Sequence, residues 1–455
     1  MKTMQVIAPS IVLSEHQLGR YTIPRWSRVA ILACMCSLLI PRGADFQIGT
    51  ILIDYTRVTL TVLAIMAAEQ VLSGKVQLQT TLADWFILGH IAVIALSALW
   101  HEGIDEGLEI AVGQVLVDMG LAYFVARVAI RDLQCYRYFI RIVVLIAVIS
   151  AVIGLSETFT GYNIVRAVYH TIFPRVLYVY LDVKRLGLYR AYALFGTDIL
   201  FGAYCMVAFA LAACMKHRNL GMSQRMYRIC LVLCLLGVFS SLSSGPWMGM
   251  AFCFFCLTYD WVMRCIRSRW KLFIFCGVAI FLFLRVFSGR GPIKILIDYT
   301  LDPQTGYVRL AMWECVWALM PKYWLLGWGW TNDWPRAVEW YFFHSVDSFY
   351  AVNLIRSGVF SVLFILGSLF YAWYRLSRVA GQKHLETNEA KGWILGTACL
   401  FFTAITVDIF GNMVSATYFL LGAGQTLFTA YEKYEFQSEH SIQTNHPLLS
   451  TAFQR

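Results

Sequence analysis

The chain has 455 residues, of which 59% are hydrophobic and only 14% are charged, and its mean hydropathy is +0.62. Soluble domains carry roughly 25% charged residues, so this composition excludes an ordinary soluble protein and indicates a polytopic helical membrane protein. The net charge of +10 does not indicate nucleic acid binding, because most Lys and Arg lie in short loops beside apolar segments.

An all-α transmembrane domain is predicted over 25–434. The preceding residues 1–24 are predicted to be a cytoplasmic segment rather than a cleaved signal peptide, because no small-residue cleavage site follows the first apolar run. The Ser, Gly and Pro residues of "SSLSSGPWMG" indicate a turn between spans seven and eight. Twelve spans are expected, at 25–41, 50–73, 83–100, 110–129, 139–158, 192–214, 228–243, 246–262, 271–287, 347–374, 392–410 and 412–431.

Charge predicts the orientation of these spans. Four loops rich in Lys and Arg, at 127–141, 215–228, 263–271 and 375–391, alternate with outer segments that include the acidic loop 101–109. This positive-inside pattern places both termini in the cytoplasm, with a disordered tail expected at 435–455. The predicted outer segments 159–190 and 288–346 are the exceptions: the first is basic, and the second is too long for a passive link.

Thirteen cysteines do not indicate a disulfide framework, because most lie within apolar runs. Cys253 and Cys256 of "CFFC" are expected to pack as small hydrophobic residues. No His or acidic cluster accompanies them, so no metal site is expected.

The long outer segment 288–346 has three parts. Residues 305–320 are apolar on most faces and predict a helix lying on or dipping into the membrane surface. Pro321, Gly327 and Gly329 then allow a tight return of the backbone, and 330–349 brings several aromatic residues to the next span. Aromatic residues at this level form an interfacial belt or stack on sugar rings, and both interpretations stay open.

His344 and Asp347 are the candidate catalytic residues. They are three residues apart and share a helix face if helical geometry begins before Val346. A carboxylate or imidazole at the water edge of a membrane suits deprotonation of a hydroxyl. The alternatives are an N-cap role for Asp347 and a structural interfacial position for His344.

Basic residues on the outer face suggest a phosphate-bearing ligand. Arg190, Arg290 and Arg309 all lie beside spans or in the surface helix, and guanidinium groups bind phosphate oxygens through paired hydrogen bonds. The alternative for each is an interaction with lipid headgroups.

Five charged residues lie within predicted spans and are costly in lipid, so they are expected to pair or to face a cavity. Structural pairing is expected for Asp118 and Asp408, whereas Arg57 and Arg356 fit either a structural or a ligand-binding role. The five are Asp54, Arg57, Asp118, Arg356 and Asp408.

Several signatures are missing from the sequence. It contains no Gly-rich phosphate loop followed by Lys and Ser or Thr, and no nucleophile elbow. The first outer loop, 41–49, offers only Asp45, so the paired acids of a metal-dependent glycosyltransferase are absent there. The chain also lacks the two matching halves typical of inverted-repeat transporters.

Three stretches resemble the O-antigen ligase and polymerase superfamily: "RAYALFGTDILFGAY" (190–204), "SLSSGPWMGM" (241–250), and "YVRLAMWECVWALMPKYWLLGWGW" (307–330) followed by "VDSFYAVNLIRSGVFS" (346–361). "YFVAR" (123–127) and "ETFTGYN" (157–163) are similar to the exopolysaccharide-polymerase branch. Two positions depart from the ligase pattern. Ser244 stands in place of an Arg, and Asp347–Ser348 in place of a His–Asn pair.

The resemblance implies a polymerase of lipid-linked repeat units in the bacterial inner membrane. Such an enzyme performs metal-independent, inverting glycosyl transfer on the periplasmic face, without a cofactor. The donor is an oligosaccharide on undecaprenyl pyrophosphate, and the candidate protein partners are a flippase and a chain-length regulator. Arg190, Arg290, Arg309 and Arg356 would bind pyrophosphate or sugar, while Asp347 or His344 would act on the acceptor hydroxyl. The alternatives are a ligase acting on lipid A-core or protein, and a transporter or flippase without covalent chemistry.

Overall fold

The computed structural model describes residues 23–40, 44–48, 51–173, 175–176, 179–266, 269–287, 303–330, 346–380 and 387–445. This part of the chain is mostly helical, as predicted. The helices are α1 (Arg25–Ser37), α2 (Tyr55–Leu72), α3 (Leu82–Glu109), the π-helix η1 (Ile110–Leu121), α4 (Ala122–Ala129), α5 (Leu133–Thr160), α6 (Ile164–Ile172), α7 (Asp198–Ala213), α8 (Gln224–Ser240), α9 (Ser244–Val262), the 3-10 turn η2 (Met263–Cys265), α10 (Arg269–Phe287), α12 (Pro303–Tyr323), α14 (Phe349–Ser357), α15 (Val359–Ala380), α16 (Asn388–Thr403) and α17 (Asn412–Asn445). Two short antiparallel hairpins pair β1 (Asp45–Ile48) with β2 (Ile51–Asp54) and β3 (Lys184–Arg185) with β4 (Leu188–Tyr189).

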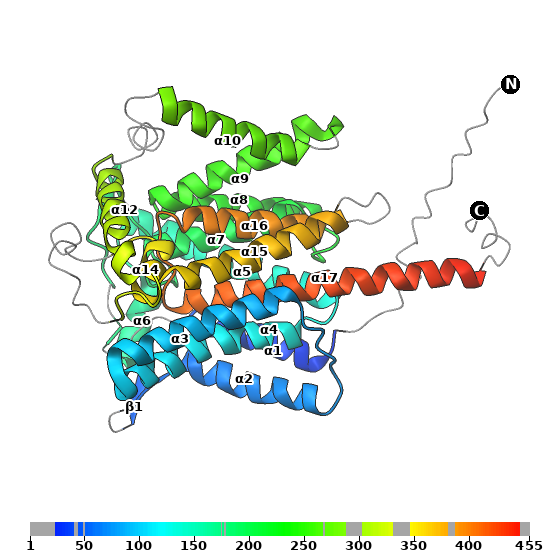
Figure 1. The fold of residues 1–455 in the computed structure, drawn as a ribbon, viewed down its shortest axis with the longest axis horizontal. Coiled ribbons are helices and arrows are strands. Elements are labelled where there is room, and N and C mark those ends of the chain that lie inside the picture. Colours follow the sequence, from blue (N-terminus) through cyan, green and yellow to red (C-terminus); the bar gives the residue numbers. More distant parts are fainter. Residues whose placement is uncertain are drawn as a thin grey trace.

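The long helices run side by side, and α12 lies across one end of them (Figure 1). The short helices α6 and α14 and the β1 hairpin lie at this same end, which we call the α12 end. Extensive packing joins α3 to α15, α5 to α8, α7 to α16 and α4 to α17, so segments distant in sequence form the core. A second, smaller apolar cluster holds α12 against α14 through Met312, Val316 and Met320.

Three described helical segments are long and apolar enough to cross a membrane: Leu82–Ala129, Leu133–Thr160 and Val359–Arg378. The first is not one straight helix, because Gly103 interrupts it with a φ of +78°. A Cβ on Gly107 would lie 2.8 Å from the backbone of Leu99, so the chain folds back on itself here. The reversal agrees with the two separate spans predicted at 83–100 and 110–129.

A described helix overlaps each of the twelve predicted ranges, and the predicted turn between spans seven and eight separates α8 from α9. The range 347–374 differs, because Gly358 divides it into α14 and α15 with a φ of +77°. Span two begins late, since residues 51–54 form β2 and Asp54 caps α2. The first part of the range expected to be a disordered tail, 435–445, is helical instead, because α17 continues to Asn445 through a segment without Gly or Pro; the rest of that range lies outside the described residues.

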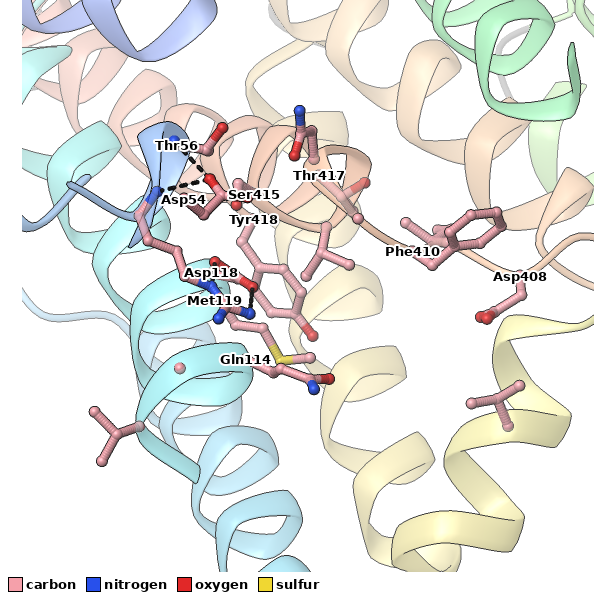
Figure 2. Close-up of a pocket in the computed structure, with 18 of the residues that line it drawn as sticks. Asp54, Thr56, Gln114, Asp118, Met119, Asp408, Phe410, Ser415, Thr417 and Tyr418 are labelled. Atoms are coloured by element: carbon pink, nitrogen blue, oxygen red, sulfur yellow. Dashed lines mark hydrogen bonds and ion pairs between the residues drawn. The ribbon is translucent and has the colours of Figure 1, made fainter. Parts of the chain in front are cut away.

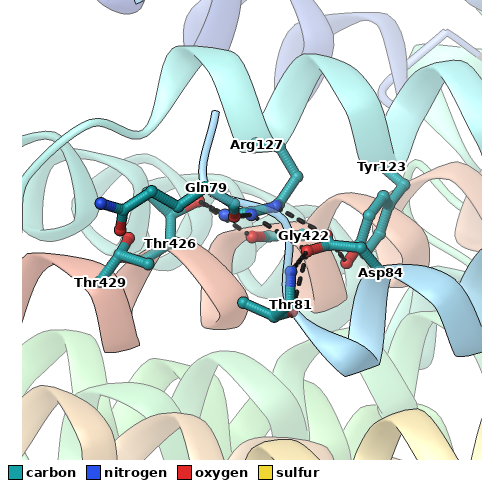
Figure 3. A network of polar contacts seen from close by, with 8 residues as sticks. All are labelled: Gln79, Thr81, Asp84, Tyr123, Arg127, Gly422, Thr426 and Thr429. Carbon is teal, nitrogen blue, oxygen red and sulfur yellow. Dashed lines mark hydrogen bonds and ion pairs between the residues drawn. The ribbon is translucent and has the colours of Figure 1, made fainter. Parts of the chain in front are cut away.

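Arg127 forms a buried polar network at the end of α3 opposite the α12 end (Figure 3). Its Nε donates to Asp84 Oδ1 at 2.9 Å, and its other nitrogens donate to Thr426 and to the carbonyl of Gln79. Tyr123 donates a further hydrogen bond to Asp84 at 2.6 Å. A buried charge is tolerated when it is paired and hydrogen-bonded in this way, so the network ties α3, α4 and α17 together.

The cysteines agree with the expectation for a packed apolar interior. All thirteen are free thiols, and both Cys253 and Cys256 are buried. Within the described segments, no group of three or more His, Cys, Asp or Glu side chains is arranged to hold a metal ion.

Candidate functional site

A cavity of about 820 Å³ lies at the α12 end, between α2, η1, α14 and the chain around the start of α17. This volume is within the range of small-molecule sites. Figure 2 shows Asp54 and Asp118 on one side of it and Asp408 on the opposite side. The polar residues of its lining include Asp45, Asp54, Arg57, Glu109, Gln114, Asp118, Asn353, Arg356, Asp408 and Asn412.

The side formed by α2 and η1 is organised around Arg57. Its Nε and one terminal nitrogen bind the two carboxylate oxygens of Asp118 at 3.3 and 3.1 Å. Asp54 caps α2 by accepting hydrogen bonds from the backbone of Thr56 and Arg57 at 2.7 and 3.3 Å. The guanidinium also lies over Gly113, where an added Cβ would approach it to 3.2 Å. We call this side, with Asp54, Glu109 and Asp118, the acidic wall.

Arg356 occupies the last turn of α14 on another part of the lining. Its guanidinium carbon lies 4.6 Å from the centre of the Trp330 ring, a cation–π arrangement. Within the described residues, neither Arg356 Nε nor Trp330 Nε1 has a hydrogen-bond partner. Arg356 is therefore a partly buried cation in the cavity lining, where a guanidinium group can bind an anionic ligand.

Backbone hydrogen bonds hold Arg356 in place by joining the turn after α12 to the end of α14. The N–H groups of Trp328 and Gly329 donate to the carbonyls of Ile355 and Arg356, the second at 3.2 Å. Val359 N–H donates to the carbonyl of Trp324 at 2.8 Å. We call this contact between 324–330 and 354–359 the glycine clasp, because side chains at its glycines would not fit.

The fit of the clasp depends on three glycines with positive φ. A Cβ on Gly327 would lie 2.4 Å from the backbone of Arg356, and one on Gly358 would lie 2.4 Å from the carbonyl oxygen of Leu325. Gly329 has a φ of +110° and packs against His101. Only glycine combines this backbone conformation with such close approach. The predicted tight return after the surface helix is therefore present, although α12 itself continues through Pro321 to Tyr323.

Asp408 lies in the connection between α16 and α17, outside the helix in which span eleven had placed it. Burial raises the pKa of its carboxyl to about 6, and the negative charge of Asp347 acts in the same direction. The nearby Arg356 guanidinium opposes that rise in the pKa. Asp347, Asp408 and Arg356 therefore form one electrostatically coupled group at the cavity.

The structure brings together only some of the predicted site residues. Arg356 lines the cavity, and the partly buried Asp347 lies close enough to Asp408 to influence its charge. Arg190 pairs with Asp198, and Arg309 is on α12; neither is among the lining residues. His344 and Arg290 lie outside the described residues. Arg190 and Arg309 therefore do not meet Arg356 at this cavity, and their proposed role in binding phosphate stays a prediction.

The alternative role of Asp347 as a helix cap is wrong. Ser348 occupies the N-cap position of α14, and its side chain accepts the hydrogen bond from the Ala351 N–H. Asp347 immediately precedes this N-cap residue.

The sequence did not point to Gln114, Trp330 or Asn412 as site residues, although all three line the cavity. The expectation that charged residues within spans pair or face a cavity is confirmed for Arg57 and Asp118, which do both. Asp54 and Asp408, from the same group, also line the cavity. The signal in the sequence was the position of these charged residues within predicted spans, where an unpaired charge is costly in lipid. No known protein-family model and no curated protein matches the sequence.

Proposed function

We propose that this protein is a membrane glycosyltransferase that polymerises oligosaccharide repeat units carried on undecaprenyl pyrophosphate. The observation that carries the proposal is the cavity at the α12 end. Its lining brings together Arg356, several carboxylates and the aromatic ring of Trp330. A ligand that is partly anion and partly sugar matches this set of groups.

The proposed reaction uses two features of the cavity. A hydroxyl oxygen of the acceptor sugar attacks the anomeric carbon of the donor, and the bond from that carbon to the pyrophosphate oxygen breaks. Arg356 stabilises the charge that develops on the departing lipid pyrophosphate. Asp347 receives the hydroxyl proton, with His344 as the alternative base.

We further propose that the chain crosses the bacterial inner membrane twelve times, with α15 as the spanning part of the range 347–374, with both termini in the cytoplasm and with the α12 end in the periplasm. The support is the distribution of charge. The basic connections between α7 and α8 and between α9 and α10 lie at the end opposite α12 (Figure 1). This arrangement follows the positive-inside rule.

The test uses purified protein in liposomes with undecaprenyl-pyrophosphate-linked repeat units, and the products are sized by gel electrophoresis. We expect a ladder of lengthening lipid-linked glycan without added metal or nucleotide. Transfer only after lipid A-core or a protein acceptor is added would mean that the protein is a ligase and not a polymerase. No transfer in either assay, together with movement of the lipid-linked unit across the bilayer, would establish transport and overturn the proposal.

A further inference from the structure

Helix α6 directly follows the apolar helix α5 at the α12 end of the molecule (Figure 1). Helix α5 is one of the segments long and apolar enough to cross a membrane, and it ends at Thr160. Gly161 then turns the chain with a φ of +69°, and α6 begins at Ile164. Because so few residues separate the two helices, a bilayer that α5 crosses has its surface at the level of α6.

The polar side of α6 faces the protein. Arg166 is 4% exposed and is the one buried residue of this fully described helix. Its guanidinium donates to the carbonyl of Phe195, and its central carbon lies 5.3 Å from the centre of the Tyr192 ring. Asn163 caps the helix by accepting from the Arg166 N–H at 2.8 Å, and its amide donates to the carbonyl of Ala193. These polar contacts attach α6 to the connection that precedes α7.

The outward side of α6 is an aliphatic stripe. Ile164, Val168 and Ile172 are 60%, 59% and 67% exposed. Their four-residue spacing places them on one face of the helix. A surface helix of a soluble protein has the opposite arrangement, since it turns its apolar face to the core and its charged residues to water. An exposed aliphatic stripe of this kind is typical of a helix that lies in a membrane interface.

The stripe follows on from an exposed apolar side of α5. Ile149, Val152 and Phe159 are 52%, 55% and 70% exposed, and their spacing places them on the same side of α5. In a helix that crosses a bilayer, exposed apolar side chains contact lipid. Phe159 brings this side of α5 to the turn that leads into α6, so the two apolar surfaces are consecutive along the chain.

The chain that pairs with the start of α6 carries residues typical of the headgroup level. Tyr162 and Tyr180 form an isolated antiparallel bridge, and their ring centres are 5.3 Å apart. Tyr180 is 71% exposed, and Lys184 further along the chain is also exposed. Tyr is enriched at membrane–water interfaces, and Lys extends its charge to the headgroups. These residues therefore suit a position beside a bilayer surface.

We infer that α6 is an interfacial helix whose aliphatic stripe, Ile164, Val168 and Ile172, inserts among phospholipid acyl chains at the α12 end. A second copy of the chain is a poorer match for this stripe. A stable protein interface buries about 800 Å² on each partner, and a nine-residue helix with three exposed aliphatic side chains offers much less. The inference depends on α5 crossing the membrane and is independent of the proposed glycosyl transfer.

The experiment places a photoreactive residue on either side of α6. Val168→p-benzoylphenylalanine and His170→p-benzoylphenylalanine are made separately in the full chain and reconstituted into liposomes of phosphatidylethanolamine and phosphatidylglycerol. Both positions are exposed, and they lie about 160° apart around the helix. After irradiation, mass spectrometry measures the fraction of protein that carries a covalently attached phospholipid. We expect at least fivefold more lipid adduct at position 168 than at position 170.

Ile149→p-benzoylphenylalanine, near the middle of α5, is the positive control and should also form a lipid adduct. Equal yields at 168 and 170 would overturn the inference, as would a covalent dimer in place of the lipid adduct at 168. No lipid adduct at 149 would overturn it through its premise that α5 crosses the bilayer. If the variant at 168 does not fold, Ile172→p-benzoylphenylalanine tests the same stripe with the same expected excess over 170. Glycan elongation plays no part in these measurements, so failure of the proposed function would leave their outcome unchanged.

Discussion

Arg127 and Arg356 are both largely buried arginines, at opposite ends of the helical bundle, and their surroundings differ. Arg127 is 6% exposed and donates to Asp84, Thr426 and the carbonyl of Gln79 (Figure 3). Arg356 lies over Trp330, and within the described residues its Nε has no hydrogen-bond partner. Arg127 is held by several side-chain and backbone partners and ties helices together, whereas Arg356 lines the cavity, where a ligand can reach it.

The largest effect is expected for Arg127→Met, which leaves the carboxylate of Asp84 without its cation. Breaking a buried pair in this way costs about 3–5 kcal/mol of stability. The thermal midpoint in detergent and the yield of folded protein should both fall. Arg269→Met, which breaks a more exposed pair with Asp260, is the control and should cost no more than about 1 kcal/mol. Equal losses in the two variants would mean that the Arg127 network does not stabilise the fold.

Arg356→Gln should produce the opposite result: loss of function with little loss of stability. Removing a donor that stabilises developing negative charge typically lowers rates by about 10²–10³-fold. Glycan elongation in liposomes measures the effect, and the thermal midpoint should stay close to that of the unmodified protein. Arg375→Gln is the control, because Arg375 lies 3.8 Å from the Phe428 ring and outside the cavity. A similar loss of elongation in both variants would contradict a specific role for Arg356.

Gly358→Ala should shift the position of Arg356 while the arginine itself is kept. Alanine at a φ of +77° is strained by about 1–3 kcal/mol, and its Cβ would meet the carbonyl oxygen of Leu325. Elongation should fall by roughly tenfold, along with a modest decrease in the thermal midpoint. Gly277→Ala is the control, because nothing lies within 4 Å of a Cβ there. Unchanged elongation in Gly358→Ala would show that the glycine clasp does not position the arginine.

The smallest effect is a pH dependence of stability due to Asp408. Burial raises its pKa to about 6, so the folded state binds this proton more tightly than the unfolded state does. Stability from this group therefore increases as the pH falls from 7 through 6, and the gain is complete below the ordinary pKa of aspartate. The thermal midpoint should rise by roughly 1–3 °C between pH 7 and pH 5 relative to Asp408→Asn. Identical pH profiles for the two proteins would contradict this prediction.

The helices themselves were predictable because their apolar segments are long and are separated by Gly, Pro and charged residues. The turn between α8 and α9 was predicted from its Ser, Gly and Pro residues, and α12 was predicted from its apolar run. The division of the tenth range at Gly358 was not predicted, because a single glycine within a helix is usually tolerated. It becomes a break here only through contact with residues 324–330, which lie distant in the sequence.

The site was less predictable than the fold. Because a charged residue in an apolar range is costly in lipid, four such residues were expected to pair or to face a cavity. All four line the cavity: Arg57, Asp118, Arg356 and Asp408. Which carboxylate meets which arginine depends on tertiary packing, since Arg57 and Asp118 are brought together by α2 and η1. The π-helix that includes Asp118 has no sequence signal of its own. Arg190, which the resemblance assigned to ligand binding, pairs with Asp198 and does not line this cavity, so its role in binding stays a prediction.

The glycine clasp connects α12 to the cavity through the backbone. The turn that ends α12 and the last turn of α14 are joined by several backbone hydrogen bonds, one of them accepted by the carbonyl of Arg356 itself. A displacement of α12 is therefore expected to shift the guanidinium of Arg356. Under the proposed function, an antibody fragment bound to the exposed side of α12 should slow glycan elongation without entering the cavity.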